Sequence, residues 1–505
     1  MLKFKKRIAK EGVTKEIVQE IIQAHREDHD RMKQLYERYK ADKDGPAIFK
    51  RSATAIDFDS DNVKRLDDKV NNLLNNAYDA DIVDTKVGYM FGHPITYDVD
   101  KNYKQLKEEL DNFLLRNNAE DDDAELGKMA AICGYAARLA YIDLEGNERI
   151  KNIDPWEAIL IGEDIHEPVY SLRYYKFNNV LYAEFYDDKN IYYFSEENGG
   201  FELDDVKPHL FDYNPLFGVA NNKELKGDAE KVLALIDAYD RTLSDASNEI
   251  EQYRLAYLIL KGMGADEETM AELKKSGVFE LLGEHDEVKY LTKDINDTMI
   301  ENHLNRLDDN IMRFAKSVNF ADEEFAGNAS GIAMKLKIMS LENKCVMMER
   351  KFTSSLRYQF KVLFSAWAKR KGYNKEDYLK VWFQFKRNLP ANILDEAQST
   401  AQLKGYVSER TRLGLLSFVD DVEYELEEMQ NDALLYGPQL EPLDSIDFDN
   451  EEEDIKKEGQ SADSTKQNKN GEACEKCGGS GSVISEKTGE TIECGKCGGD
   501  GVIKR

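Results

Sequence analysis

The sequence lacks any long apolar run, and this absence excludes a protein with membrane-spanning helices. No segment approaches the roughly twenty apolar residues that a membrane-spanning helix needs. The N-terminal stretch MLKFKKRIAKEG is basic, but it lacks the apolar core of about seven to fifteen residues that a signal peptide requires. We therefore expect a soluble, intracellular protein with no membrane partner.

An excess of positive charge is also lacking. The 505 residues include 69 Lys and Arg against 98 Asp and Glu, which gives a formal net charge of −29. DNA-binding surfaces normally depend on Lys and Arg side chains that displace the counterions of the phosphate backbone. Nonspecific affinity for DNA is therefore not expected, and any contact with DNA must be unusual.

Signatures of common enzymes are missing. The sequence has neither a G-x-x-x-x-G-K-[ST] phosphate loop nor a G-x-S-x-G elbow. Its seven histidines form no metal-ligand pattern beyond His25 and His29, which we expect on the solvated face of an acidic helix. Abundant carboxylates without a pairing pattern are poor support for acid–base chemistry. We predict no catalytic residue; a metal-dependent nuclease is a minor alternative, which a cleavage assay with Mg²⁺ would test.

Cysteine is rare except at the C-terminus. Of six cysteines, Cys133 and Cys345 stand alone among apolar neighbours and are predicted to be small buried hydrophobes. The other four form two copies of C-x-x-C-x-G-x-G, and their thiolates suit one closed, structural Zn²⁺ site per chain. The predicted ligands are Cys474, Cys477, Cys494 and Cys497. Disulfides or redox cysteines are the alternatives, disfavoured by an intracellular location.

These C-terminal repeats resemble half of the cysteine-rich region of DnaJ-type chaperones. The resemblance covers only the last part of the chain, and no DnaJ-like histidine-proline-aspartate helix is present. It implies a zinc knuckle over 471–505 and, as an alternative function, a zinc-dependent adaptor that binds proteins. An acidic segment poor in apolar residues, 437–470, is predicted to be a disordered linker before the knuckle.

The rest of the chain is rich enough in apolar residues to fold into two to four domains of α+β class, mainly helical. Helical periodicity marks 14–41, 61–90 and 101–118, and a buried helix followed by a strand is expected over 129–143. Between 148 and 213, alternation of aromatic or β-branched residues with polar ones predicts three to five antiparallel strands.

Two segments, 226–261 and 293–318, carry apolar residues at spacings that alternate between three and four, a heptad pattern. The residues we expect to form the packing seam are Ile236, Leu243, Ile250, Leu304, Leu307 and Ile311. A short α/β excursion, 262–292, lies between them. The two helices could form an ordinary bundle within one chain, or they could present their seams to neighbouring subunits.

A glycine-rich loop directly precedes the longest predicted helix. The loop, 319–330, ends in FAGNAS, and the helix over 331–372, which begins at the next glycine, has an apolar stripe. The stripe consists of Leu341, Cys345, Met348, Phe352, Leu356, Phe360, Leu363 and Trp367. One strand and a connection follow over 373–400, and further helices over 401–436.

Several motifs in this order resemble the portal proteins of long-tailed, siphovirus-type double-stranded DNA bacteriophages. They are NNAYDADIVDTKVGYMFGHPITY, ICGYAARLAYID, IDPWEAILI, LIDAYDRTLSDASNEIEQY, FAGNASGIAMKLKIMSLENKCVMMERKF and FQFKRNLPANILDEAQSTAQLKGYVS. The resemblance spans about residues 60–430, and the zinc knuckle lies outside the usual pattern. It implies a homo-oligomeric ring of about twelve subunits at one capsid vertex of the virion, assembled in the host cytoplasm.

The resemblance also implies partners and parts. A terminase drives double-stranded DNA in through the ring, a head-completion or tail adaptor protein binds it later, and scaffolding and major capsid proteins surround it. The implied parts are N-terminal helices and wing (1–225), stem helices (226–261 and 293–318), clip (262–292), tunnel loop (319–330), long helix to the wing (331–372), wing strand (373–400) and crown helices (401–436). The tunnel-loop residues are Phe325, Gly327, Asn328, Ser330 and Gly331. Glycine and asparagine would let this loop adjust as DNA slides past, and an acidic lumen would hold DNA weakly.

Overall fold

The structure of the protein is a computed structural model. It describes residues 2–51, 71–197, 199–253, 257–261, 287–291, 296–320, 331–389, 393–416, 418–419, 422–436, 472–473, 482–484, 491–493 and 502–503. The chain forms two compact units, Met1–Pro390 and Ala391–Arg505. A bilayer-spanning helix, which would need a long apolar stretch, is not found in the described part of the chain.

Two helices begin unit 1, α1 (Leu2–Glu11) and α2 (Lys15–Tyr39). Thr14 caps α2 because its side chain accepts a hydrogen bond from the backbone N–H of Ile17 at 3.4 Å. The prediction for His25 is wrong: it is 3 % exposed, and its Nδ1 lies 3.0 Å from the hydroxyl of Tyr174. Burial lowers the pKa of His25 to about 4.

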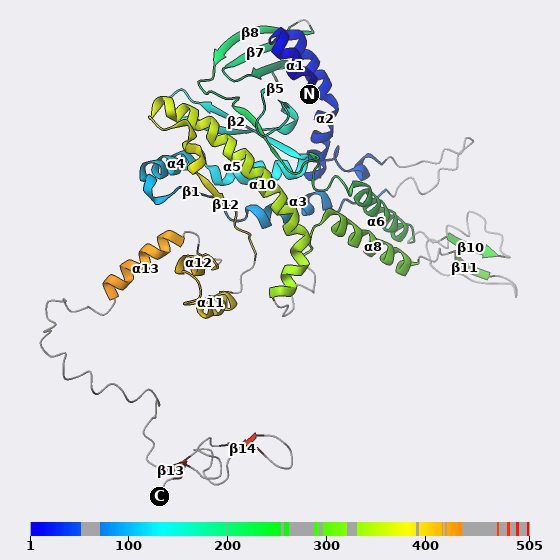
Figure 1. The fold of residues 1–505 in the computed structure, drawn as a ribbon. Coiled ribbons are helices and arrows are strands. Elements are labelled where there is room, and N and C mark those ends of the chain that lie inside the picture. The colour runs from blue at the N-terminus through cyan, green and yellow to red at the C-terminus, as the bar shows by residue number, and fades with distance from the viewer. Residues whose placement is uncertain are drawn as a thin grey trace, which may run out of the picture. The chain divides into compact units, whose positions relative to one another are not determined.

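A five-stranded antiparallel sheet in the order β4-β5-β6-β7-β8 packs one face against α1 and α2 (Figure 1). Its strands are β4 (Ala158–Ile161), β5 (Tyr170–Phe177), β6 (Val180–Tyr186), β7 (Asn190–Glu197) and β8 (Gly200–Pro208). With β3, the region predicted to hold three to five strands holds six. In the middle of β5 and β6, the buried Leu172, Tyr174, Ala183 and Phe185 alternate with the partly exposed Arg173 and Glu184, which is the period of a sheet with one covered face.

A second, three-stranded sheet in the order β3-β2-β9 lies against the long helix α10 and helix α5. Its strands are β2 (Tyr135–Ile142), β3 (Glu148–Ile153) and β9 (Leu216–Ala220). The helices around it are α3 (Tyr78–Phe91), α4 (Lys104–Arg116) and α5 (Ala119–Cys133). The predicted buried helix and strand around 129–143 are therefore confirmed as α5 and β2.

Helix α10 (Gly331–Arg370) is the central element of the largest core. All eight residues of its predicted stripe are at most 1 % exposed, so this prediction is confirmed. The helix is followed by β12 (Trp382–Gln384), which pairs antiparallel with β1 (Thr96–Asp98). Cys133 and Cys345 are both fully buried, as predicted.

Short elements complete unit 1: the 3₁₀ turns η1 (Ala47–Lys50), η3 (Lys101–Tyr103), η4 (Pro155–Glu157) and η5 (Lys375–Lys380). Unit 2 contains α11 (Ile393–Gln402), α12 (Glu409–Leu413) and α13 (Val422–Tyr436). Four short strands follow in two antiparallel pairs, β13 (Glu472–Ala473) with β16 (Val502–Ile503), and β14 (Ser482–Ile484) with β15 (Thr491–Glu493). The predicted linker 437–470 lies outside the described residues.

Candidate functional site: the projecting helical hairpin

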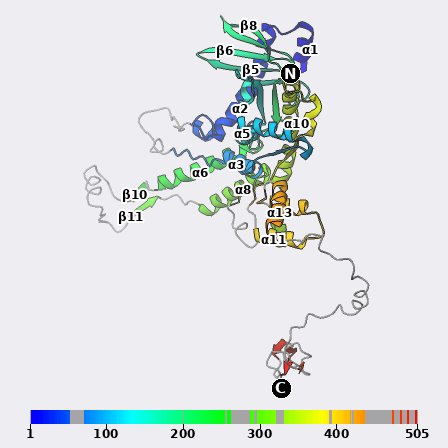
Figure 2. The same ribbon diagram turned by 90° about the vertical axis from the view of Figure 1, so that its left-hand side faces the viewer.

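Helices α6 (Leu233–Tyr253) and α8 (Asp297–Ala315) lie side by side and extend away from the two sheets of unit 1 (Figures 1 and 2). Beyond them, β10 (Tyr257–Lys261) pairs antiparallel with β11 (Glu287–Leu291). The helix predicted over 226–261 is shorter than expected at both ends, because α6 begins only at Leu233 and residues 257–261 belong to a strand. We call α6, α8 and these two strands the hairpin.

The base of the hairpin has an apolar core shared with α3. Its buried members are Ile82, Ala229, Val232, Ile236, Ile311 and Ala315. Tyr78 of α3 stacks edge-on against Tyr239, with ring centroids 5.1 Å apart, and donates its hydroxyl to Asp308 at 2.5 Å. Both hairpin helices are thus fixed to the same residue of α3.

The predicted seam is buried at the base of the hairpin but not along its whole length. Ile236 and Ile311 are fully buried, and Leu307 is 7 % exposed. Leu243 and Leu304 are only partly buried. Ile250 is 63 % exposed, and on α8 the apolar residues Met299 and Phe314 are 64 % and 56 % exposed. The chain itself therefore covers only part of this apolar surface.

An extended segment, 71–77, runs along α6 and is tied to it by its backbone. The N–H groups of alternate residues donate to successive turns of the helix: Asn72 to Asn248 Oδ1 at 2.7 Å, Leu74 to Ser244 Oγ at 3.0 Å and Asn76 to Asp240 Oδ1 at 3.0 Å. We call these three helix residues the polar ladder.

The spacing of the ladder follows from backbone geometry. Two residues of an extended chain advance about 6.6 Å, and four residues of a helix advance about 6.0 Å, so the two repeats match over this length. Burial raises the pKa of the Asp240 carboxyl, although Asn76 opposes the rise. The helix predicted over 61–90 is wrong here, because α3 begins only at Tyr78. Four asparagines in NNLLNN (71–76) were the available signal.

Two buried ionic clusters join the hairpin to the rest of unit 1. In the first, Arg38 of α2 donates two hydrogen bonds of 3.1 Å to Asp79 of α3 and one of 2.8 Å to Asp237 of α6. Burial raises the pKa of Asp79, although Arg38 opposes the rise. Because removing one partner from such a cluster leaves a buried charge, Arg38 strongly couples α6 to the body.

The second cluster centres on Asp228, just before α6. Its carboxylate lies 3.0 Å from the ammonium of Lys86 on α3 and 3.1 Å from that of Lys344 on α10. Burial alone would raise the pKa of Asp228, but the two lysines outweigh it and lower the pKa. Lys344 also donates to the backbone carbonyl of Ala315 at 2.9 Å, so it binds the last turn of α8 as well.

Other predicted site residues lie outside the described part of the chain. These are the tunnel-loop residues Phe325, Gly327, Asn328 and Ser330 and the zinc ligands Cys474, Cys477, Cys494 and Cys497. Gly331 is described as the first residue of α10. Within the described ranges, no group of three or more His, Cys, Asp or Glu residues could hold a metal ion.

Comparisons with known proteins concern most of the chain. A family model described as "Phage portal protein, SPP1 Gp6-like" matches residues 18–433. The chain is 27 % identical over 420 residues to the portal protein of Bacillus phage SPP1, covering 77 % of this chain and 82 % of that protein. It is 26 % identical over 407 residues to the portal protein of Clostridium phage phiCD119, covering 74 % of this chain and 87 % of that protein.

Proposed function

Because the chain belongs to the SPP1 Gp6-like family of phage portal proteins, we propose that about twelve copies assemble into a ring at one vertex of a phage capsid. The observation that carries this proposal is the incomplete burial of the hairpin seam. Ile250 of the seam and the apolar residues Met299 and Phe314 of α8 are more than half exposed in a single chain. Neighbouring hairpins in a ring would cover such residues, and this burial would drive assembly.

Assembly can be tested on the purified protein. A ring of about twelve 57.9-kDa chains has a mass of roughly 0.7 MDa, which electron microscopy and mass photometry would detect. Ile250→Asp should prevent ring formation because it places a charge on the seam. The matched control is Leu115→Asp on α4, which is 81 % exposed and far from the seam in sequence. Rings formed equally well by both variants would contradict the proposal.

We further propose that the ring is a channel for double-stranded DNA and has no catalytic site. DNA would enter through it during packaging by a terminase and leave through it during ejection. The hairpin helices favour this use by their charge: α8 contains four acidic and two basic residues, and α6 contains five acidic and one basic. An acidic lumen repels phosphates, so it would keep DNA from adhering to the wall.

The loop before α10 is proposed to line the narrowest part of this channel. Gly327 and Asn328, together with Gly331 at the junction with α10, would give it the backbone freedom to follow a helical duplex whose symmetry differs from that of the ring. Replacing Gly327 and Gly331 by alanine should leave rings intact but lower DNA packaging. Unchanged packaging by the double variant would remove the hinge role.

The partners follow from the same proposal. The ring would bind the terminase during packaging and a head-completion or tail adaptor protein afterwards, and scaffolding and major capsid proteins would surround it in the virion. A zinc-dependent adaptor of DnaJ type is not supported by the family match. Deleting residues 441–505 should therefore leave ring formation unchanged.

The C-terminal cysteines are proposed to bind one structural Zn²⁺ per chain. The support is the spacing of the two C-x-x-C pairs. Elemental analysis should find about one equivalent of zinc, and Cys494→Ser should lose it. A zinc-free wild-type protein would end this proposal without affecting the ring.

A further inference from the structure

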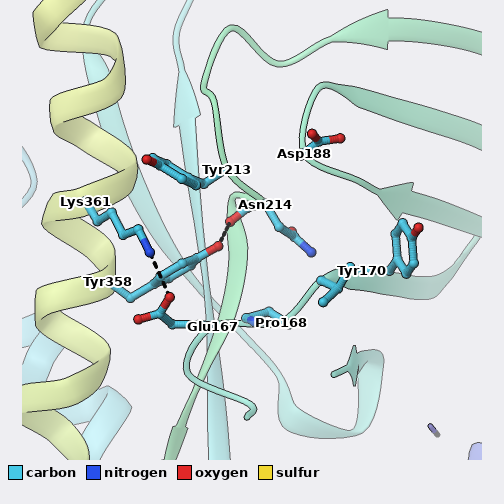
Figure 3. Close-up of a pocket in the computed structure, with 9 residues that line it drawn as sticks. Glu167, Pro168, Tyr170, Asp188, Tyr213, Asn214, Tyr358 and Lys361 are labelled. Atoms are coloured by element: carbon cyan, nitrogen blue, oxygen red, sulfur yellow. Dashed lines mark hydrogen bonds and ion pairs between the residues drawn. The ribbon is translucent and has the colours of Figure 1, made fainter. Parts of the chain in front are cut away.

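A pocket of about 350 Å³ lies on unit 1, away from the hairpin, where α10 meets the chain segments that lead into β5 and β9 (Figure 3). Helix α10 contributes Tyr358 and Lys361, and the segment before β9 contributes Tyr213 and Asn214. The rest of the lining comes from the segment 167–170 at the start of β5 and from Asp188 in the turn between β6 and β7.

Asn214 points an unpartnered donor into this pocket. Its Oδ1 accepts hydrogen bonds from the backbone N–H of Leu216 at 3.1 Å and from Ser171 Oγ at 2.8 Å. A backbone N–H can only donate, so the side-chain atom that faces Leu216 must be the oxygen. The amide nitrogen therefore points the other way, toward Tyr170 (Figure 3). Asn214 is 2 % exposed, and its Nδ2 has no hydrogen-bond partner among the described residues.

Such a donor selects a ligand with an acceptor oxygen. A buried N–H without a partner is unfavourable, and a carbonyl or carboxylate oxygen would satisfy it. Asn214 is held in place, because Tyr358 also donates its hydroxyl to the Asn214 backbone carbonyl at 3.1 Å. The donor is thus part of a fixed wall.

The charge of the lining decides between the two kinds of acceptor. Glu167 is neutralised by Lys361, whose ammonium lies 2.8 Å from its carboxylate. Asp188 is exposed and leaves the pocket with one surplus negative charge. A ligand carboxylate would be repelled, so the acceptor is a neutral carbonyl, and a neighbouring positive group would be attracted.

The aromatic walls favour a planar cation. The ammonium of Lys361 already lies over the rings of Tyr213 and Tyr358, at 5.0 and 5.7 Å from their centroids. Tyr170 offers a further partly exposed ring on the other side of Asn214 (Figure 3). A guanidinium stacks on such rings and pairs with a carboxylate more readily than an ammonium does.

We propose that this pocket binds an arginine of a partner protein, with the backbone carbonyl beside that arginine accepting from Asn214 and the guanidinium lying between Tyr170 and Asp188. The partner is a protein segment that presents one arginine, whose charge complements the surplus negative charge of Asp188. This inference rests on the pocket alone and does not require the ring or the DNA channel.

Binding can be measured by saturation-transfer NMR with N-acetyl-arginine methylamide as the probe, at concentrations up to about 10 mM, which suit millimolar dissociation constants. The neutral isostere is N-acetyl-citrulline methylamide, which keeps the shape and both carbonyls. We expect transfer to the arginine probe and much weaker transfer to citrulline. No transfer to arginine, or equal transfer to both probes, would overturn the proposal.

Two substitutions test the two contacts separately. Asp188→Asn should weaken arginine binding about three- to fivefold, whereas Asp44→Asn, in an exposed turn after α2, should not. Asn214→Asp keeps the acceptor for Leu216 and Ser171 but removes the donor. It should weaken binding even though it adds a negative charge; tighter binding by this variant would show that charge alone governs the pocket and would overturn the donor role.

Discussion

Helix α10 and the hairpin have similar apolar periodicity but opposite surroundings. Every residue of the α10 stripe from Leu341 to Trp367 is buried within unit 1. In the hairpin, the seam is buried at Ile236 and Ile311 but open at Ile250. Periodicity thus identifies the face that avoids water, and only the surrounding elements show whether the same chain covers it.

The largest expected difference between these regions concerns phenylalanine. Phe352 on α10 is fully buried between Phe91 and Phe385, with ring centroids 5.2 and 5.8 Å away. Phe352→Ala should lower the free energy of unfolding by about 3–5 kcal/mol through the cavity it leaves. In the unassembled chain, where Phe314 of α8 is exposed, Phe314→Ala should cost less than about 1 kcal/mol. Denaturant unfolding at a fixed oligomeric state measures both, and equal losses would erase the contrast.

A second test compares two histidines of α2, the buried His25 and the more exposed His29. The unfolded chain protonates His25 near pH 6.5, whereas the folded chain does so only near pH 4. The stability linked to neutral His25 is therefore complete above pH 6.5 and is lost as the pH falls toward 4. The loss could reach about 3 kcal/mol.

The pH dependence of unfolding between pH 7 and 4.5 measures this loss. His25→Gln should flatten that dependence, because the titrating group is gone. His29→Gln, one turn further along α2 at a more exposed position, should retain the wild-type slope. A wild-type slope in His25→Gln would mean that other groups govern the acid range.

A smaller loss of stability is expected when one hydrogen bond of the polar ladder, which lies on the hairpin, is removed. Ser244→Ala removes the acceptor of the Leu74 N–H and should cost about 1–2 kcal/mol. Hydrogen exchange at the Leu74 amide should accelerate accordingly. Thr242→Ala is the matched control, because the Thr242 hydroxyl donates only within α6, to the Ala238 carbonyl. Unchanged exchange in Ser244→Ala would show that the ladder does not hold segment 71–77.

The smallest expected signal is the reactivity of Cys345 on the α10 stripe. Burial raises the pKa of its thiol to about 11. In the native protein, a maleimide should leave the Cys345 peptide unlabelled by mass spectrometry, and labelling should require denaturant. Rapid native labelling would indicate that this part of the α10 core opens.

Sequence patterns correctly predict the elements in which contacts with distant parts of the chain leave the local apolar period unchanged. The α10 stripe and the strands of the five-stranded sheet follow from local apolar spacing, and both were predicted. Segment 71–77 was missed because its hydrogen-bond acceptors lie about 170 residues away, as between Leu74 and Ser244. His25 was misjudged for the same reason, since Tyr174 is 149 residues distant.

The hairpin shows a similar limit. Tyr257 continues the heptad of α6, so local spacing predicted helix as far as residue 261. Pairing of β10 with β11 overrides this preference, from Tyr257 opposite Leu291 to Lys261 opposite Glu287. The clustering of Glu167, Asn214 and Lys361 around one pocket likewise depends on three separate segments. No local sequence motif predicts it.

The position of Lys344 has a mechanical consequence. One ammonium group binds both the terminal carbonyl of α8 and the carboxylate that precedes α6, and it is carried by the long helix. A rotation of the first turns of α10 about its own axis would therefore pull on both arms of the hairpin at once. Strain that rotates the N-terminal end of α10 would therefore tilt the whole hairpin.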